Sequence, residues 1–286
     1  MFKFPETIQI PLADWVDTAM DWILANLGGV FDAIGTIILQ ILLAVENFLL
    51  FLPWFVILIL VGLLAWKAFG SVVKGVGFML LMVIIGTFGY WDLAMMTLAI
   101  IIASVFFALL IGIPTGILMS RNDTFQGVIR PILDAMQTMP SFVYLIPALM
   151  LFGLGKVPAT FATIIYAVPP VIRLTNVGIR QVDKDVIEAA RAFGARPREI
   201  LFDIQLPLAW PSIMVGINQT TMMALAMVVI GSMIGAKGLG LEVLLSINRI
   251  EVGRGFEAGL SIVILAIIID RITHAFADTK KTDESS

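Results

Sequence analysis

The 286-residue chain contains no cysteine and only one histidine, His274. Disulfide bridges, thiolate metal sites and cysteine nucleophiles are therefore excluded, as is a site with several histidine ligands. Charged residues make up 14% of the chain, against about 25% in an ordinary soluble protein. The net charge of −3 offers no basic surface for nucleic acid. We therefore expect no metal site, no cofactor and no nucleic-acid partner.

Apolar residues, in contrast, are in excess at 59%, and the mean hydropathy is +1.01. A soluble domain of this size would expose apolar patches that aggregate. Because one transmembrane helix needs about 20 apolar residues, the composition predicts an all-α polytopic membrane protein with about seven transmembrane helices. The expected spans cover residues 48–66, 76–91, 93–119, 135–155, 157–172, 204–236 and 258–269.

The basic residues divide unevenly between the two sides of these spans. Thirteen of the 18 lysines and arginines fall in alternate loops and in the C-terminal tail, and six of them lie between Arg173 and Arg198. Positive residues are enriched in cytoplasmic loops. We therefore expect the C-terminus to be cytoplasmic and the N-terminus to lie outside the cytoplasmic membrane.

Residues 1–47 precede the first strong span and carry a run of acidic positions. These recur at three- and four-residue steps and so share one helical face. We expect an amphipathic outer helix packed against the protein's own spans, because helices that bind membrane surfaces are mostly basic. An eighth span over residues 34–52 is the alternative, against which Gln40 and Glu46 weigh. The acidic face contains Asp14, Asp17, Asp21, Gly28 and Asp32.

The longest charged loop, residues 173–203, has the signals of two short helices. Asp183 suits the position before a helix, Gly194 suits a helix end with positive φ, and Pro197 suits the first turn of a second helix. Pro207 is expected to stop that helix and open the next span. The loop therefore presents a short, rigid knob to the cytoplasm.

The same loop reads Glu188-Ala189-Ala190, then, after three further residues, Gly194-Ala195, and then Ile204 and Leu206-Pro207. This pattern resembles the EAA loop of ABC importer membrane subunits. The runs 136–159, 168–182 and 218–240 are similar to permeases of the glycine betaine/proline importers, and the likeness covers roughly residues 90–270. The resemblance implies a type I importer membrane-domain fold and import of quaternary ammonium osmoprotectants. The residues that match the loop, and so would couple to an ATPase, are Glu188, Ala189, Ala190, Gly194, Ala195, Ile204, Leu206 and Pro207.

The resemblance also implies partners. They are an ATP-binding subunit in two copies, a separate periplasmic or lipid-anchored solute-binding protein, a second copy of this chain and the lipid of the bacterial inner membrane. The chain's own glycine–lysine clusters, at residues 153–157 and 235–240, lack the GxxxxGK[ST] spacing that cradles phosphates. ATP and Mg²⁺ are therefore expected on the partner, and this chain is expected to be a transporter subunit rather than an enzyme.

Four segments follow from these patterns. We expect an outer scaffold helix over residues 1–47 and two peripheral spans over 48–91. The core domain is expected over 92–276, with the coupling loop at 180–207, and a disordered tail over 277–286.

Two groups of polar residues within the spans are candidates for the translocation path. Such side chains either line a path or form hydrogen bonds between helices, which contribute about 1 kcal/mol each. Prolines near both groups can kink the helices, and this favours the assignment to a path. No aromatic cage for a quaternary ammonium is clustered in the later spans, so affinity is expected to reside in the binding protein. The candidates are Gln137, Thr138, Pro140, Asn218, Gln219 and Thr220.

Other functions stay open at this point. An ABC permease for methionine, sulfonate or phosphate shares the EAA loop but lacks the other matching runs. A secondary osmolyte carrier normally needs ionisable residues at mid-membrane, whereas Asp92 and Asp134 lie at the ends of expected spans. A membrane scaffold without transport gives the loop no purpose. The identity of the quaternary amine is not recorded in these patterns.

Overall fold

The computed structural model describes residues 10–283, with side chains as far as residue 275. All regular structure in this part of the chain is helical, so the predicted all-α fold is confirmed. Short 3₁₀ segments occupy Ser141–Tyr144 and Ser232–Ile234, and a π-helical turn occupies Ile200–Gln205. The α-helices are α1 (Leu12–Phe51), α2 (Trp54–Phe69), α3 (Val72–Thr87), α4 (Trp91–Arg121), α5 (Asp123–Thr138), α6 (Leu145–Phe152), α7 (Lys156–Arg180), α8 (Lys184–Ala192), α9 (Pro197–Glu199), α10 (Leu206–Gly231), α11 (Leu239–Arg249) and α12 (Val252–Asp283).

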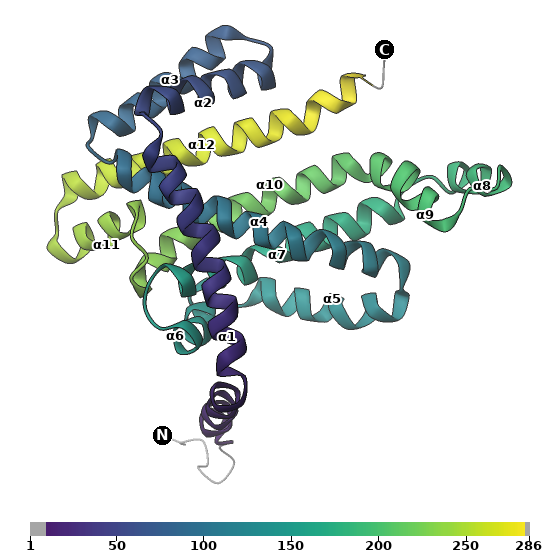
Figure 1. Ribbon diagram of the computed structural model, residues 1–286, viewed down its shortest axis with the longest axis horizontal. Helices are drawn as coiled ribbons and strands as arrows, with labels where there is room; N and C mark the ends of the chain where they lie inside the picture. Colours follow the sequence, from purple (N-terminus) through teal and green to yellow (C-terminus); the bar gives the residue numbers. More distant parts are fainter. Residues whose placement is uncertain (1–9, 284–286) are drawn as a thin grey trace, which may run out of the picture.

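A bundle of α4, α7, α10 and α12 runs along the long axis of the molecule (Figure 1), with α7 packed between α4 and α10. Small residues let these helices approach closely. Gly112 and Gly116 of α4 face α7, and a Cβ added to Gly116 would lie 2.7 Å from the Ile172 carbonyl oxygen. Gly178 and Gly216 serve the contact between α7 and α10 in the same way.

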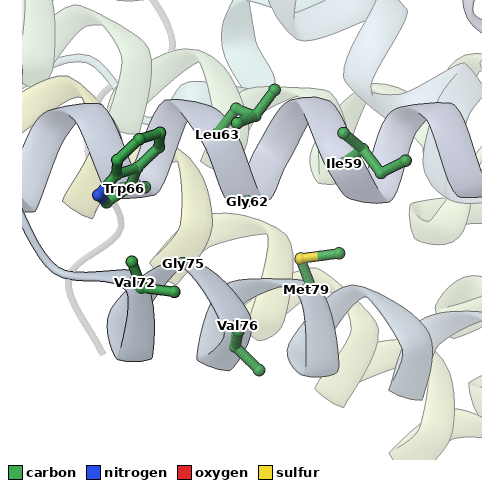
Figure 2. A pocket seen from close by; sticks show the side chains of 8 residues that line it. All are labelled: Ile59, Gly62, Leu63, Trp66, Val72, Gly75, Val76 and Met79. Carbon is green, nitrogen blue, oxygen red and sulfur yellow. The ribbon is translucent and has the colours of Figure 1, made fainter.

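The helices α2 and α3 form a hairpin at the edge of the bundle, beside α12 (Figure 1). Each has 16 residues, which at a rise of about 1.5 Å gives roughly 24 Å. Gly62 and Gly75 bring the two helices together, and a shallow apolar groove of about 270 Å³ lies over the contact. Figure 2 shows this groove between the two helices, with Trp66 and Val72 near the turn and Ile59 and Met79 farther along.

The predicted number of seven spans is not confirmed. Five helical segments are long and apolar enough to cross a membrane, and α5 with the following segment to Phe152 makes a sixth if a bent pair counts as one span. The helices α2 and α3 fall short of this length. The expected spans 93–119 and 204–236 correspond to α4 and α10.

The span expected over residues 135–155 is not one continuous helix. The chain bends by 112° between α5 and the segment Ser141–Phe152. Met139 is extended, with φ −69° and ψ 136°, because the residue before a proline, here Pro140, avoids the helical region. The proline that was expected to kink a helix thus breaks it.

The N-terminal boundary also differs from the prediction. The helix α1 continues to Phe51, so the expected boundary between residues 47 and 48 lies inside a helix. The break falls at Leu52, which is extended before Pro53. Figure 1 shows α1 running across the bundle rather than along it, and it contacts α4, α6 and α7. This course favours a helix packed on the protein's own spans, although its length and composition also suit a span.

Two helices in the second half of the chain are longer than predicted. α7 runs to Arg180, past the expected span 157–172, and α12 fills Val252–Asp283 rather than residues 258–269. The tail expected to be disordered from residue 277 is therefore helical as far as Asp283, and residues 284–286 lie outside the described part. The first nine residues of the expected outer helix lie outside it as well.

A buried ion pair fixes α1 to the bundle. The Lys156 ammonium, in the first turn of α7, lies 2.6 Å from both carboxylate oxygens of Glu46. The two side chains are 18% and 8% exposed, and Ile38 and Leu42 on the same face of α1 are buried too. Glu46, which weighs against a membrane span in the sequence, is accommodated because a partner 110 residues away neutralises it.

Replacing Glu46 by alanine should lower the melting temperature of the detergent-solubilised protein markedly. The change leaves the Lys156 ammonium, whose side chain is 18% exposed, without its partner, and losing hydrogen bonds between charged groups costs about 1.5–3 kcal/mol. Thermal melting of the purified chain measures the effect. The double variant Glu46→Leu with Lys156→Met removes both charges and should recover most of the loss. Equal melting temperatures for the single and double variants would contradict this account.

Candidate functional site

The helix α8 (Lys184–Ala192) ends in a defined hydrogen-bonded turn. Gly194 has a φ of +83°, in the left-handed region that glycine enters at no steric cost. Its N–H donates to the Arg191 carbonyl at 2.9 Å, and the Ala195 N–H donates to the Ala190 carbonyl at 3.0 Å. These two bonds form a Schellman motif. The predicted positive φ at Gly194 is confirmed.

The helix starts in this loop also follow local signals. The Asp183 carboxylate accepts a hydrogen bond from the Asp185 N–H at 2.9 Å and caps α8. Pro197 is the first residue of α9, where its missing N–H is harmless. The Arg196 N–H just before it donates to the Glu199 carboxylate at 2.6 Å. Both helix starts lie where the sequence predicts them.

Pro207, in contrast, does not stop the second helix. The helical path runs from α9 through the π turn Ile200–Gln205 directly into α10, where Pro207 is the second residue. The Leu206 N–H donates to the Leu201 carbonyl in the π turn, so the chain enters α10 with a pairing that departs from the i−4 pattern that a proline disrupts. The knob is thus joined to α10 without a flexible break.

The loop rests on a hydrophobic cluster at one end of the bundle. Ile187 from α8 and Leu206 from α10 pack against its buried core. In addition, the Arg121 guanidinium at the end of α4 donates to the Pro197 carbonyl at 3.2 Å. Three bundle helices therefore hold the knob in place. The buried residues of the cluster are Ile179, Val182, Leu201, Ala209 and Ile213.

The outer face of the knob is open. Figure 1 shows α8 and α9 projecting from one end of the molecule, and no residue of α8 is buried. The tip carries Phe193, whose side chain is 93% exposed. Large exposed apolar side chains mark protein interfaces. The sequence offers one signal for this residue, an aromatic between a charged helix and a glycine.

The residues predicted for the coupling loop fall on two sides of this knob. Those on the bundle side are half-buried and position the helices, whereas the others are exposed and available to a partner. Their coupling role stays a prediction. The half-buried residues are Ala190, Ala195, Ile204 and Leu206, and the exposed ones are Glu188, Ala189, Gly194 and Pro207.

The first group of predicted path residues lies at the break between α5 and the segment that follows. Gln137 and Thr138 end α5, Pro140 follows the bend, and all three are exposed in the single chain. The Thr138 hydroxyl donates to the Ala135 carbonyl at 2.9 Å, which satisfies it within its own helix.

The second group lies on α10 and faces different surroundings. Asn218 is buried and donates to the Asp270 carboxylate at 3.2 Å, and its side-chain oxygen accepts from the Thr273 hydroxyl at 2.5 Å. These bonds join α10 to α12 and match the alternative of interhelical contact. Gln219 is exposed, whereas Thr220 is buried and its hydroxyl has no hydrogen-bond partner in the described part of the chain. The assignment of either group to a path stays a prediction.

Family comparison adds to this geometry. Residues 108–281 match the family described as binding-protein-dependent transport system inner membrane component. The chain belongs to this family. It is a membrane subunit of a transporter and not an enzyme, as predicted.

Several curated permeases are similar to this one over nearly its whole length. The glycine betaine/proline betaine transport system permease protein ProW of Escherichia coli (strain K12) is 48% identical, over 93% of this chain and 75% of that protein. The glycine betaine permease OpuAB of Bacillus subtilis (strain 168) is 44% identical, over 96% and 97%. The glycine betaine/carnitine permease GbuB of Listeria monocytogenes serotype 1/2a (strain 10403S) is 44% identical, over 98% and 100%.

Solved structures share the fold of this permease. A chain of the inward-facing MetNI methionine ABC transporter aligns with a TM-score of 0.58 at 23% identity, over 64% of this chain and 92% of that one. A chain of an amino acid ABC transporter aligns with a TM-score of 0.55 at 21% identity, over 69% and 97%. The predicted importer fold is confirmed. The family match contains every predicted site residue and leaves α1–α3 outside.

Proposed function

We propose that this permease forms the membrane pathway of an ATP-driven importer for quaternary ammonium osmoprotectants of the glycine betaine type. The carrying observation is the substrate shared by its relatives. Proteins named for glycine betaine are 44–48% identical over nearly the full chain. The trimethylamine N-oxide permease of Ruegeria pomeroyi and the choline permease of Bacillus subtilis follow at 34%. All of these solutes carry a nitrogen with three methyl groups.

The source of energy is a separate ATPase that docks on the α8–α9 knob. The exposed Phe193 provides an apolar anchor, and the exposed Glu188 provides a charge for a basic residue of the partner. Because the knob is packed on α4, α7 and α10, a movement of the ATPase displaces the knob and these helices together as a rigid unit. The exposed face of the loop thus binds the ATPase, and its half-buried face joins the loop to the bundle.

Two copies of the chain form a symmetric homodimer, each with its own ATPase. One knob per chain and two ATPase subunits require a two-fold arrangement. The α8 end is cytoplasmic, the C-terminus lies on the same side, and the N-terminus lies outside. The solute-binding protein docks at the opposite end of the bundle, where Figure 1 shows α11. The basic residues near the knob support this orientation.

Uptake into proteoliposomes tests the function and the orientation together. Vesicles containing this permease and its ATPase receive ATP inside, and the solute-binding protein with labelled glycine betaine is added outside. Accumulation should require all three proteins and internal ATP, and labelled methionine should not accumulate. Accumulation of betaine without the ATPase, or of methionine in its place, would overturn the proposal. Competition by choline, carnitine and trimethylamine N-oxide then ranks the solutes.

A further inference from the structure

The helices α5 and α7 face each other with complementary polar stripes. On α5 the polar residues follow steps of three and four, so they share one face. The facing stripe on α7 has the same spacing in the opposite direction. The two helices are in contact and lie alongside each other near the α8 end of the molecule (Figure 1). The α5 stripe is Asp123, Gln126, Arg130 and Asp134, and the α7 stripe is Arg180, Asn176 and Arg173.

Charges match at both ends of this interface and not in the middle. At one end Arg180 pairs with Asp123 at 2.6 Å, and at the other Arg173 pairs with Asp134. Arg130 lies between the two pairs along α5. Arg130 is exposed, and in the described part of the chain it forms no ion pair, so the centre of the interface carries a guanidinium without an acidic partner.

A cavity of about 230 Å³ occupies this centre. Its polar lining consists of Arg130 and Gln126 from α5 with Arg173 and Asn176 from α7, and no acidic side chain lines it. The cavity is small compared with pockets for drug-sized ligands, which start at about 300 Å³. Two guanidinium groups and two carboxamides in so small a volume suit a compact anion and repel a cation.

Two side chains of α7, Asn176 and Arg173, bring hydrogen-bond donors to the cavity. Asn176 is 4% exposed, and its side-chain oxygen accepts from the Arg180 Nε at 3.0 Å. This bond uses the carboxamide oxygen and leaves the carboxamide nitrogen to donate elsewhere. The Arg173 Nε, whose residue also lines the cavity, is buried without an acceptor in the described part of the chain. A buried donor without a partner is costly, and a bound oxyanion would supply an acceptor for it.

We propose that this cavity is a binding site for a small oxyanion of the phosphate class, held by Arg130, Arg173 and Asn176 between α5 and α7. The lining does not suit a quaternary ammonium solute, because it has no aromatic ring and no acidic side chain, and its two guanidinium groups include one, that of Arg130, without an acidic partner. The anion binds side chains of both helices at the centre of the interface and so stabilises the contact between α5 and α7. The Arg180 guanidinium beside the site also donates to the Met119 carbonyl at 2.8 Å, and α7 leads directly into the knob. Binding of the anion therefore reduces the mobility of the end of α7, where the coupling loop begins.

Thermal melting of the full chain in nanodiscs of neutral phosphatidylcholine tests the site. Inorganic phosphate replaces chloride at constant ionic strength, and the melting temperature should rise saturably. In Arg130→Gln the phosphate concentration that gives half of this rise should be at least about tenfold higher, which corresponds to a loss of about 1.4 kcal/mol in binding free energy. The matched control is Lys67→Gln, which removes one exposed positive charge from α2 and should leave the midpoint unchanged.

A second variant and a lipid arm make the test decisive. Gln126→Glu places a carboxylate beside Arg130, so it should raise the melting temperature without phosphate and abolish the phosphate response. Nanodiscs containing phosphatidylglycerol identify the source. If phosphatidylglycerol raises the melting temperature in a way that depends on Arg130, and phosphate adds nothing further, the site binds a lipid headgroup. If only phosphate raises the melting temperature, the site binds the free ion. The absence of a saturable response to both, or equal responses of Arg130→Gln and Lys67→Gln, would overturn the site. Neither result depends on which solute is transported.

Discussion

Valine in place of Gly194 should reduce ATP-dependent uptake of glycine betaine to background while the protein still inserts. The backbone there has a φ of +83°, and a β-branched residue at positive φ costs of order 1–3 kcal/mol. The strain is relieved by releasing the hydrogen bonds that end α8, and Phe193 at the tip then loses its fixed direction. Uptake by proteoliposomes, normalised to the amount of inserted protein, measures the loss.

Matched variants separate backbone strain from other causes. Asparagine tolerates the left-handed region better than other non-glycine residues, so Gly194→Asn should keep most of the uptake. Gly127→Val places the same side chain on α5, where a Cβ meets nothing within 4 Å, and should transport normally. Glu188→Arg leaves the backbone unchanged and should also abolish uptake, because it reverses the charge offered to the ATPase. Full uptake by Gly194→Val would refute the coupling role of this turn.

The largest structural effect is expected from Gly116→Val, which should prevent α4 from packing on α7. An added Cβ would lie 2.7 Å from the Ile172 carbonyl oxygen and 2.6 Å from the Thr175 Cβ. Because one of these neighbours is backbone, no side-chain rotation relieves the clash and the helices must separate. Overpacking a core costs about 1–3 kcal/mol and occasionally more. We expect little folded protein, measured as the monodisperse fraction on size-exclusion chromatography after solubilisation.

The control for this variant is Gly77→Val. Gly77 lies on α3 with nothing within 4 Å of an added Cβ, so the same change should leave yield and melting temperature unchanged. Gly116→Ala, which adds the Cβ alone, should fall between the wild type and Gly116→Val. A monodisperse, normally melting Gly116→Val protein would show that the contact between α4 and α7 is looser than these distances require.

Signals that act within one or two helical turns are readable from the sequence. Long apolar runs predict the all-α membrane fold, because a helix satisfies its own backbone hydrogen bonds in lipid. The coupling loop is predictable for the same reason. Asp183, Gly194 and Pro197 act on the backbone groups next to them, and all three have the expected roles. Two other prolines are the exception. A helix ends just before Pro140, whereas Pro207 lies within a helix that continues through it. The effect of a proline depends on its position within the helix.

Contacts between distant segments were decided only by the tertiary structure. Glu46 is tolerated because Lys156 lies against it, and α1 crosses the bundle in contact with α4, α6 and α7. Asn218, a candidate for the path in the sequence, turns out to join α10 to α12. Arg130 is one more basic loop residue until α5 is placed on α7, where two ion pairs leave it unmatched. The sequence by itself determined that the chain is helical and how the helices of the coupling loop are capped. Their pairing, and with it every buried charge, depends on helix packing, which no local pattern records.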